Sequence, residues 1–359
     1  MLNPHLPAEW EPQDAILLLW PHKDTHWKSL LDNALQLYEA LVSVICDYAD
    51  ILIALPDVEI ENARSRLEAM SVPLEHVYFY PVVVDDVSYN TWIRDHGPIA
   101  VVTPKGMKLL DFRLSSYGML NNCDMLNSYD EKSNLVFANK ISKQLQIQNA
   151  FPAAEFEVQD WALEGSAIET DGQGTLLTKT SYFLNKKINT DLSKDDIESR
   201  LKIVFGVNKI IWLEHGCLGK DSHYIDELVR FGPNNTIVYT ACDDEQDSFY
   251  DELKKMESEL ENITNAQGEP FRLLPLPWPG AMYNDDDERL QVSYANFLVV
   301  NEVVLVPIYN ALSDEDALDV IFQAFPGFNI MGIPCTTLSE QGGSLHRIAM
   351  QLPEGVLGF

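Results

Sequence analysis

The 359-residue sequence predicts an α/β fold, in which short strands and longer helices alternate along the chain. Two observations carry this prediction. Apolar runs of strand length recur throughout, and helical patterns separate many of them. Periodicity alone does not distinguish a doubly wound sheet from a barrel. No Pro/Gly/Ser-rich linker or sharp change of composition divides the chain, so we expect one domain over residues 1–359.

The expected strands are short runs rich in apolar and β-branched residues, which favour extended structure. They lie at 16–20, 51–55, 77–84, 99–102, 175–179, 210–213, 236–240, 271–274, 297–307 and 328–332. Helical patterns cover 27–48, 59–70, 195–204, 245–261 and 314–324. Asp195 and Asp314 stand near the starts of two of these helices, where a carboxylate offsets the positive end of the helix dipole.

The composition is typical of a chain with a substantial apolar core, since 46% of the residues are hydrophobic. Five cysteines, at positions 46, 123, 217, 242 and 335, show no Cys-x-x-Cys spacing and are interpreted as reduced thiols. The N-terminus lacks a basic region followed by an apolar stretch, and the longest apolar runs are too short to cross a bilayer. We therefore expect a cytoplasmic protein that does not contact a membrane.

The formal net charge is −30, from 55 acidic and 25 basic residues. Phosphate binding requires a basic surface, so we expect no nucleic acid and no anionic membrane as a partner. The charge favours a small cationic ligand with a guanidino or amine group, although it also serves solubility. Acidic runs at 242–247 and 284–288 lack the spacing of a calcium loop and are expected to be solvated. No metal or cofactor is predicted.

The segment Asn90-Thr-Trp-Ile-Arg-Asp-His-Gly-Pro98 lies between two strand-like runs, and its Gly-Pro pair marks a turn or loop. Asp95 can accept two hydrogen bonds from a guanidinium, and Trp92 can offer its ring face to the same cation. A local ion pair between Arg94 and Asp95 would be the better explanation of this segment taken alone. Cation binding becomes the stronger interpretation only when other segments are considered with it.

Four further segments lie at 6–12, 161–168, 221–231 and 342–347. They read Leu-Pro-Ala-Glu-Trp-Glu-Pro, Trp-Ala-Leu-Glu-Gly-Ser-Ala-Ile, Asp-Ser-His-Tyr-Ile-Asp-Glu-Leu-Val-Arg-Phe and Gly-Gly-Ser-Leu-His-Arg. In order and spacing, the five segments resemble the agmatine deiminase and bacterial-type peptidylarginine deiminase family of the guanidine-modifying pentein superfamily. Weaker similarity fills the gaps, so the resemblance covers essentially the whole chain.

The resemblance implies a role for each matching position. The aspartate of the Trp-x-Arg-Asp-x-Gly-Pro loop binds the substrate guanidinium, and it is present as Asp95. The glutamate of a Glu-Gly-Gly turn, which protonates or orients the guanidinium, is present as Glu164. In the Gly-His-Ile-Asp segment, the second guanidinium ligand is present as Asp226, but the general acid/base histidine is replaced by Tyr224. The cysteine nucleophile of the Gly-Gly-x-x-His-Cys turn falls on Arg347.

These two replacements remove the reacting groups of the implied chemistry. Deimination needs a thiolate that attacks the guanidinium carbon and a base that helps water to hydrolyse the covalent intermediate. Arg347 carries no nucleophile, and Tyr224, with an ordinary tyrosine pKa of roughly 10, is a poor base at neutral pH. His223 is the candidate substitute base, but on a strand its side chain would face away from the site. Cys335 is expected to be a buried thiol at the end of a strand.

Arg347 itself suggests an occupant for the pocket. Clustered carboxylates without a cation repel one another. A guanidinium in the place of the thiol can reach Asp95, Glu164 or Asp226 and imitate the head group of the substrate. We predict a charge-assisted contact, at roughly 2.7–2.9 Å, between Arg347 and at least one of these carboxylates. The contrary expectation is a solvated arginine at the surface, which the apolar residues around it disfavour.

The resemblance also implies a pentein propeller of five ββαβ units around a pseudo-fivefold axis, with the site at the central channel, although the sequence shows no clear repeat. Ile188 stands where the family has an arginine, which puts other family contacts in doubt. Three interpretations stay open. The chain is a pseudoenzyme that binds a cationic ligand or a partner, an active hydrolase of the putrescine pathway that uses His223, or an interaction protein whose acidic exterior matters most. The family also implies a homodimer.

Overall fold

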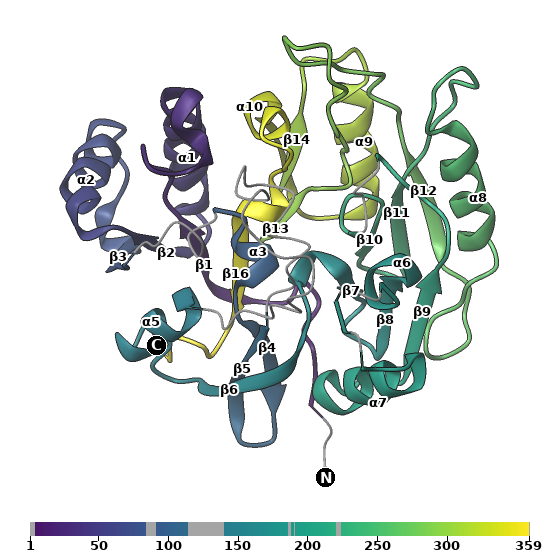
Figure 1. Ribbon diagram of the computed structural model, residues 1–359, viewed down its shortest axis with the longest axis horizontal. Helices are drawn as coiled ribbons and strands as arrows, with labels where there is room; N and C mark the ends of the chain where they lie inside the picture. The colour runs from purple at the N-terminus through teal and green to yellow at the C-terminus, as the bar shows by residue number, and fades with distance from the viewer. Residues whose placement is uncertain are drawn as a thin grey trace.

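The computed structural model describes residues 4–83, 91–113, 140–185, 188–189, 191–219 and 224–358 (Figure 1). The strands are β1 Gln13–Leu19, β2 Asp50–Leu55, β3 Val77–Pro81, β4 Ile99–Thr103, β5 Gly106–Arg113, β6 Glu155–Ala162, β7 Ile168–Thr170, β8 Thr175–Lys179, β9 Lys209–Leu213, β10 Val229–Gly232, β11 Thr236–Thr240, β12 Arg272–Leu276, β13 Leu298–Val300, β14 Val303–Ile308, β15 Asn329–Pro334 and β16 Ala349–Pro353. The α-helices are α1 Leu31–Ile45, α2 Ile60–Ala69, α3 Ile93–His96, α5 Lys140–Ile147, α6 Thr180–Phe183, α7 Lys194–Phe205, α8 Tyr250–Leu260, α9 Asp314–Ala324 and α10 Thr336–Glu340. Short 3-10 helices are η1 His26–Ser29, η2 Asp57–Glu59, η3 Leu74–His76, η5 Gly165–Ala167 and η6 His346–Ile348.

In the described residues the strands form five small sheets that repeat one pattern. Their strand orders are β16-β1-β2-β3, β4-β5-β6, β7-β8-β9, β10-β11-β12 and β13-β14-β15. In each sheet the first two strands pair antiparallel and the third is parallel to the second. A parallel neighbour requires a crossover, and each crossover contains a helix, as in β1-α1-β2 and β14-α9-β15. The repeated unit is therefore ββαβ, with β16 from the C-terminal end completing the unit that begins at β1.

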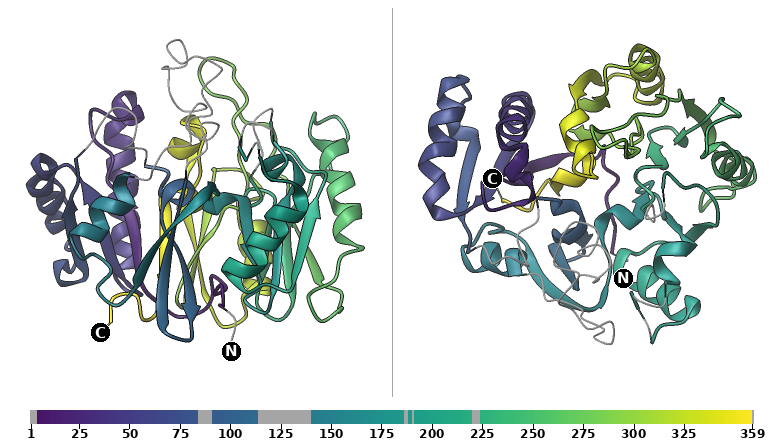
Figure 2. Two further views of the ribbon diagram at one scale, coloured as in Figure 1. Left: turned by 60° about the horizontal axis from the view of Figure 1, so that its bottom comes forward. Right: turned by 45° about the horizontal axis from the view of Figure 1, so that its top comes forward.

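The first strand of each unit faces the middle of the molecule. Strands β7, β10 and β13 are buried at every position, and β16 at all but its last residue, whereas β6, β12 and β15 expose many of theirs. Figure 2 shows the units arranged around a common centre, and Figure 1 shows most of the long helices at the periphery. The buried starts of these four strands and of β4 therefore meet in the middle, which is where side chains from distant segments come together.

Helix α1 illustrates stabilisation by a buried apolar face, and helix α7 illustrates stabilisation by its end residues. In α1 the fully buried positions 34, 38, 41, 42 and 45 lie on one face of the helix. Helix α7 begins with a capping box, in which Ser193 accepts the Asp196 N–H and the Asp196 side chain accepts the Ser193 N–H. It ends at Gly206, whose φ of 68° suits glycine. Its predicted start near Asp195 is correct to within one residue.

The predicted α/β class is confirmed, and α9 has the bounds expected from its pattern. The strand expected over 297–307 is instead a hairpin of β13 and β14. Asn301 turns the chain with a φ of 46°, and its amide bonds Gln13 and Tyr48. The helix expected over 27–48 begins only at Leu31, after a separate 3-10 turn. None of the helices within the described ranges has the length and apolar character needed to cross a bilayer.

Candidate functional site

The candidate site lies where the buried first strands of the units begin. The segments that precede these strands are α3 before β4, η5 before β7, residues 224–228 before β10, residue 296 before β13 and η6 before β16. They come from widely separated parts of the chain, since one ion pair in the site joins residues 252 positions apart. The fold therefore brings together motifs that no local stretch of sequence contains.

Arg347 is at the centre of this group and is buried, with 4% of its surface exposed. Its Nη2 donates to Oδ2 of Asp95 at 2.6 Å, and its Nη1 donates to the Gly342 carbonyl at 3.2 Å. The predicted contact between Arg347 and a carboxylate is thus present, and the alternative of a solvated surface arginine is wrong. The carbon of the guanidinium lies 4.7 Å from the ring centre of Tyr224 and 5.4 Å from that of Trp92, within range of a cation–ring attraction.

Tyr224 and Arg347, at which the sequence predicts departures from the family pattern, touch each other. The ring of Tyr224 packs against the Arg347 guanidinium, and its hydroxyl donates to Oε2 of Glu164 at 2.8 Å. Glu164 is thereby engaged by the tyrosine, and no hydrogen bond or ion pair in the described site joins it to Arg347. Ser166, at a position where the resemblance implies a glycine, donates to the second oxygen of Asp95 at 2.6 Å. Asp95 and Glu164 therefore each have a partner at a position where the sequence predicts a replacement.

Asp226 belongs to a different set of contacts. Its Oδ2 lies 2.7 Å from Nδ1 of His346, and Nε2 of the same ring lies 2.6 Å from Oε1 of Glu9. Both ring nitrogens of His346 therefore lie within hydrogen-bond distance of a carboxylate. The Oδ1 atom of Asp226 is buried and has no hydrogen-bond partner among the described residues. The sequence predicts three carboxylates that Arg347 can reach in one pocket. In the structure Asp95 contacts Arg347, whereas Asp226 contacts His346.

Trp92 faces a cation, as the sequence predicts, but this cation is the protein's own Arg347. The indole is fully buried, and it stacks on His26 at 5.4 Å and meets Trp27 edge-on at 5.6 Å between ring centres. A Cβ atom at Gly343 would lie 2.2 Å from the indole, so only glycine allows the turn before Arg347 to pass this close. Burial, helped by the charge of Arg347, lowers the pKa of His26 to about 4, so that ring is neutral at neutral pH.

The electrostatics favour a charged Arg347 and a neutral Tyr224. Burial opposes the guanidinium charge, but Asp95, Tyr224 and Glu227 together hold the pKa of Arg347 above its ordinary value. Burial and the charge of Glu164 raise the pKa of Tyr224 well above that of a free tyrosine. The phenol therefore keeps its proton at neutral pH and acts as a hydrogen-bond donor, not as a base.

Glu227 is a member of the site that the sequence analysis missed. Its side chain is buried, and its Oε2 has no hydrogen-bond partner among the described residues. Burial raises the pKa of Glu227 to about 7, against the opposing charge of Arg347. The available signal was its place directly after Asp226 in the Tyr-Ile-Asp-Glu segment.

Glu9 and His346 were also missed, and they lie beneath the Arg347 turn in a buried ionic cluster. Glu9 contacts His346, Nη1 of Arg94 at 3.4 Å and Nη2 of Arg230 at 2.5 Å. Although burial opposes it, Arg230 and the neighbouring cations hold the pKa of Glu9 below its ordinary value. The signal was the opening Leu6–Pro12 segment, which the sequence links to the family without indicating a role for Glu9.

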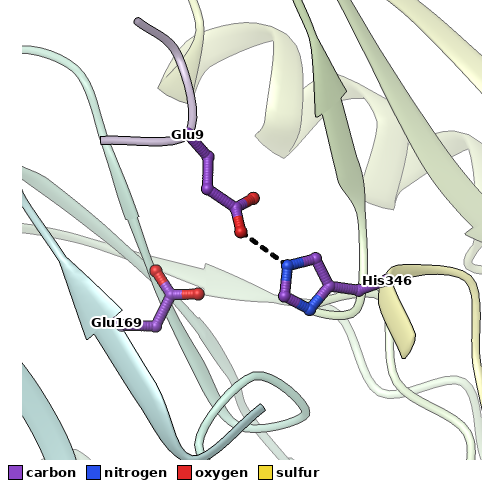
Figure 3. A group of neighbouring side chains, drawn as sticks. All are labelled: Glu9, Glu169 and His346. Atoms are coloured by element: carbon purple, nitrogen blue, oxygen red, sulfur yellow. Dashed lines mark hydrogen bonds and ion pairs between the residues drawn. The ribbon is translucent and has the colours of Figure 1, made fainter. Parts of the chain in front are cut away.

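Glu9, Glu169 and His346 have ligand atoms close enough together to hold a metal ion (Figure 3). The chemistry of the cluster does not fit that use. Arg230 already pairs with both carboxylates through Nη2 and Nε, and a metal ion would leave this fully buried guanidinium without its charged partners. Both nitrogens of His346 are also engaged. The cluster is therefore a self-neutralised set of charges.

A cavity of about 80 Å³ lies beside Glu9, between the N-terminal segment and the strands β4, β7 and β16. Gln13 and Arg94 also line it. The guanidinium of Arg94 is used by Glu9 and by Gln351, and Gln13 donates to the carbonyls of Glu9 and Val299. The cavity therefore lies below the ionic cluster and does not include Arg347.

The sequence analysis considered His223 in place of the family's base, and it expected Cys335 to be a buried thiol. His223, the candidate substitute base, lies outside the described residues. Cys335 directly follows β15, is fully buried, and has a pKa raised by burial above that of a free thiol. It is the buried strand-end thiol that the sequence predicts, and its hidden, protonated sulfur is not a nucleophile.

The model of the Porphyromonas-type peptidyl-arginine deiminase family matches residues 5–353 of the chain. A relative from Yersinia pseudotuberculosis, named "Putative agmatine deiminase", is 30% identical over 97% of this chain and 95% of its own. The structure of C. jejuni agmatine deiminase with substrate bound, a cysteine-to-serine variant, is 31% identical with a TM-score of 0.83 over 98% of this chain and 97% of that chain. A Porphyromonas gingivalis structure named "Putative Arginine Deiminase" is 33% identical with a TM-score of 0.84 over 98% and 99% of the two chains.

Proposed function

Because the chain belongs to the Porphyromonas-type peptidyl-arginine deiminase family, we propose that it is a degenerate member that binds a cation instead of deiminating a guanidino group. The observation that carries this proposal is the contact of 2.6 Å between Arg347 and Asp95, at the position that the family motif gives to the nucleophile. In this proposal the protein acts by binding a small guanidino or amine ligand, or a partner protein, and uses no cofactor.

The chemistry of position 347 supports the loss of deimination. The reaction needs an electron pair that attacks the guanidinium carbon and a leaving ammonia that takes up a proton. A guanidinium has five donors and no acceptor, so Arg347 cannot form that bond. Its guanidinium also forms an ion pair with Asp95, the carboxylate that the resemblance assigns to substrate binding.

The chemistry of position 224 supports the same conclusion. The Tyr224 hydroxyl donates a hydrogen bond to Glu164 at 2.8 Å, and burial raises the pKa of Tyr224 well above the ordinary value. A group in this state does not take a proton from water at neutral pH. Both steps of the family reaction, attack and hydrolysis, therefore lack the group that performs them.

Assays of ammonia release and of ureido product test the proposal directly. Purified protein incubated with agmatine, or with arginine-containing peptides, is expected to give no product above buffer, with C. jejuni agmatine deiminase as the positive control. Turnover by the wild type that disappears in His223→Ala would establish the competing function, a hydrolase with a recruited base. Turnover that survives this change would also contradict the proposal.

A gain-of-function variant asks whether only two groups are missing. Arg347→Cys combined with Tyr224→His restores a thiol and an imidazole beside Asp95 and Glu164, and we expect ammonia release from agmatine above the wild-type level. Each single variant serves as the control, because neither supplies both attack and proton transfer. An inactive, folded double variant would assign the remaining defect to other positions, with Asp226, which is engaged by His346, as the first to be changed.

A further inference from the structure

We propose that Arg347 is an internal ligand, and that the residues around its guanidinium form a receptor that the native chain keeps closed. The inference rests on the proposed loss of deimination and deepens it, because it names the ligand class and the device that excludes it. With the side chain of residue 347 shortened, the site takes a free guanidinium ion or a monoalkyl guanidinium. With Arg347 in place, an external guanidino ligand has to displace that side chain and is expected to bind at least about tenfold more weakly.

The walls of the receptor are held by contacts that do not involve Arg347. Asp95 is fixed by the hydroxyl of Ser166 at 2.6 Å. Tyr224 is fixed by its hydrogen bond to Glu164 at 2.8 Å. Removing the arginine side chain therefore leaves the carboxylate and the phenol ring in position, so that the vacated site is preorganised for the next occupant.

The third wall, Trp92, is held in the same way. Its indole stacks on His26 and meets Trp27, and the Trp27 indole N–H donates to Thr91 at 2.8 Å. These aromatic contacts lie on the side of the protein core and persist without Arg347. The receptor therefore retains two ring faces, at 4.7 and 5.4 Å from the present guanidinium carbon, together with one carboxylate.

The shape of the walls selects a planar cation. A guanidinium stacks on a ring face and donates to a carboxylate from its edge, whereas an ammonium is a compact point charge that does not stack. Urea has the same planar shape as guanidinium without the charge, so Asp95 attracts it only as a neutral donor. Guanidinium is therefore expected to bind at least about tenfold more tightly than urea, which lacks the charge, and than ammonium, which lacks the planar face that stacks on the rings.

The charges around the site also favour a cation. Glu227 interacts electrostatically with Arg347 and Asp95, and its buried Oε2 has no hydrogen-bond partner among the described residues. Loss of the Arg347 charge leaves these carboxyl groups facing one another, which is unfavourable until a cation enters or a proton is taken up. A bound guanidinium restores the balance without a change in the fold.

Competition from Arg347 weakens the binding of external guanidinium to the native chain. A tethered occupant acts at a high effective concentration, so a free ion of the same chemistry must displace it at a large disadvantage. The site in the wild type is also buried, since Arg347, Asp95 and Tyr224 are each less than 7% exposed. A natural guanidino ligand would therefore require that the Arg347 turn moves first.

The experiment measures guanidinium binding to Arg347→Ala by calorimetry and by the thermal midpoint, at concentrations of guanidinium chloride well below those that denature proteins. We expect saturable binding and a rise in the midpoint for this variant, and at least about tenfold weaker binding to the wild type. Sodium chloride, ammonium chloride and urea at equal concentration provide the ligand controls. Arg347→Ala with Asp95→Asn should lose at least about tenfold in affinity, because the carboxylate is gone.

Arg289→Ala is the matched control variant. Arg289 also pairs with a carboxylate, Asp247 at 2.6 Å, and lies over two rings, Phe249 at 4.0 Å and Trp278 at 6.0 Å. Its side chain is 20% exposed, however, and water enters when it is removed. Saturable stabilisation by guanidinium of similar size in this variant would mean that the effect is general and would overturn the proposal.

Arg347→Cys is the second variant if the alanine protein does not fold, because the family motif has a cysteine at this position and the fold accommodates it there. A folded Arg347→Ala or Arg347→Cys protein with no affinity for guanidinium contradicts the inference. This failure is distinguishable from failure of the proposed function, which is read from product formation by the wild type. Wild-type protein that binds guanidinium as tightly as the variants also contradicts the inference.

Discussion

Two arginines of this protein make nearly the same contacts in two different places. Arg347 pairs with Asp95 at 2.6 Å and packs on aromatic rings, and Arg289 does so with Asp247 at the same distance. The first pair joins residues 252 positions apart at the centre of the molecule, and the second joins residues 42 positions apart in its outer part. The chemistry of the group is therefore common to both, and only the position of the first pair gives it a functional interpretation.

The carboxylates differ in what else they bind. Asp247 also accepts the backbone N–H of Phe249 and the indole N–H of Trp278, so that its role in a local turn is evident. Asp95 accepts only one other hydrogen bond in the described residues, from Ser166 on a different unit. A carboxylate that serves no local turn, and that faces a cation from a distant segment, is arranged as a receptor. The following changes test this contrast, from the largest expected effect to the smallest.

Asp95→Asn should destabilise the protein by about 3–5 kcal/mol, because it leaves the buried Arg347 guanidinium without its charged partner. Asp247→Asn should cost less, about 1–2 kcal/mol, since Arg289 can turn toward water. Urea unfolding of both variants and the wild type measures the difference. Equal losses would remove the distinction between the two sites.

Glu227→Gln should change how stability depends on pH. The folded-state pKa of Glu227, about 7, lies above its unfolded value of 4.5, because burial disfavours the charged carboxylate. A raised acid pKa contributes stability that is present below the unfolded pKa and is lost as the pH rises to the folded pKa. The free energy of unfolding of the variant, relative to the wild type, should therefore rise between pH 5 and pH 8, by on the order of 2 kcal/mol.

Urea unfolding at pH 5 and at pH 8 measures this change for both proteins. Glu169 is the internal comparison, because its pKa is also raised by burial, to about 8, but it pairs with Arg230 in the cluster below the site. Its contribution is present in both proteins and cancels in the difference. A difference that stays constant between the two pH values would contradict the assignment of this pH dependence to Glu227.

A double-mutant cycle with Arg347→Ala and Tyr224→Leu should give a coupling free energy of about 1–2 kcal/mol, since a desolvated cation lies on the ring. The matched cycle with Arg289→Ala and Phe249→Leu should give about 0.5–1 kcal/mol, because that pair is partly exposed. Unfolding free energies of the seven proteins, with the wild type shared by the two cycles, supply both values. Zero coupling at the central pair would mean that the two replaced positions act independently.

The predicted elements were most accurate where the pattern is local. Helix α9 has the expected bounds because its apolar positions and its acidic first turn lie within one segment. The strand expected over 297–307 failed because it contains no Gly or Pro at its turn, and Asn301 takes the left-handed conformation while its amide bonds two distant backbone groups. The five ββαβ units were implied by family resemblance alone, since diverged units leave no visible repeat.

The site residues also divide into those that local motifs predict and those that depend on tertiary contacts. Asp95, Glu164, Tyr224 and Arg347 could be placed together from motifs, and the structure brings them within direct contact of one another or of a shared neighbour. The pairing of Asp226 with His346, and of His346 with Glu9, could not be anticipated. It depends on how the N-terminal segment enters beneath the strands, and no spacing in the sequence encodes that path.

The sequence by itself determined the chemistry available at positions 224 and 347, because a guanidinium has no electron pair to donate and a phenol is a weak base whatever surrounds them. Only the tertiary structure decided that Arg347 and Tyr224 lie against each other, and that Arg347 selects Asp95 among three carboxylates. The reason is physical. The identity of a side chain sets its chemistry, but its partner is set by the register of five separate sheets, which bring together residues far apart along the chain.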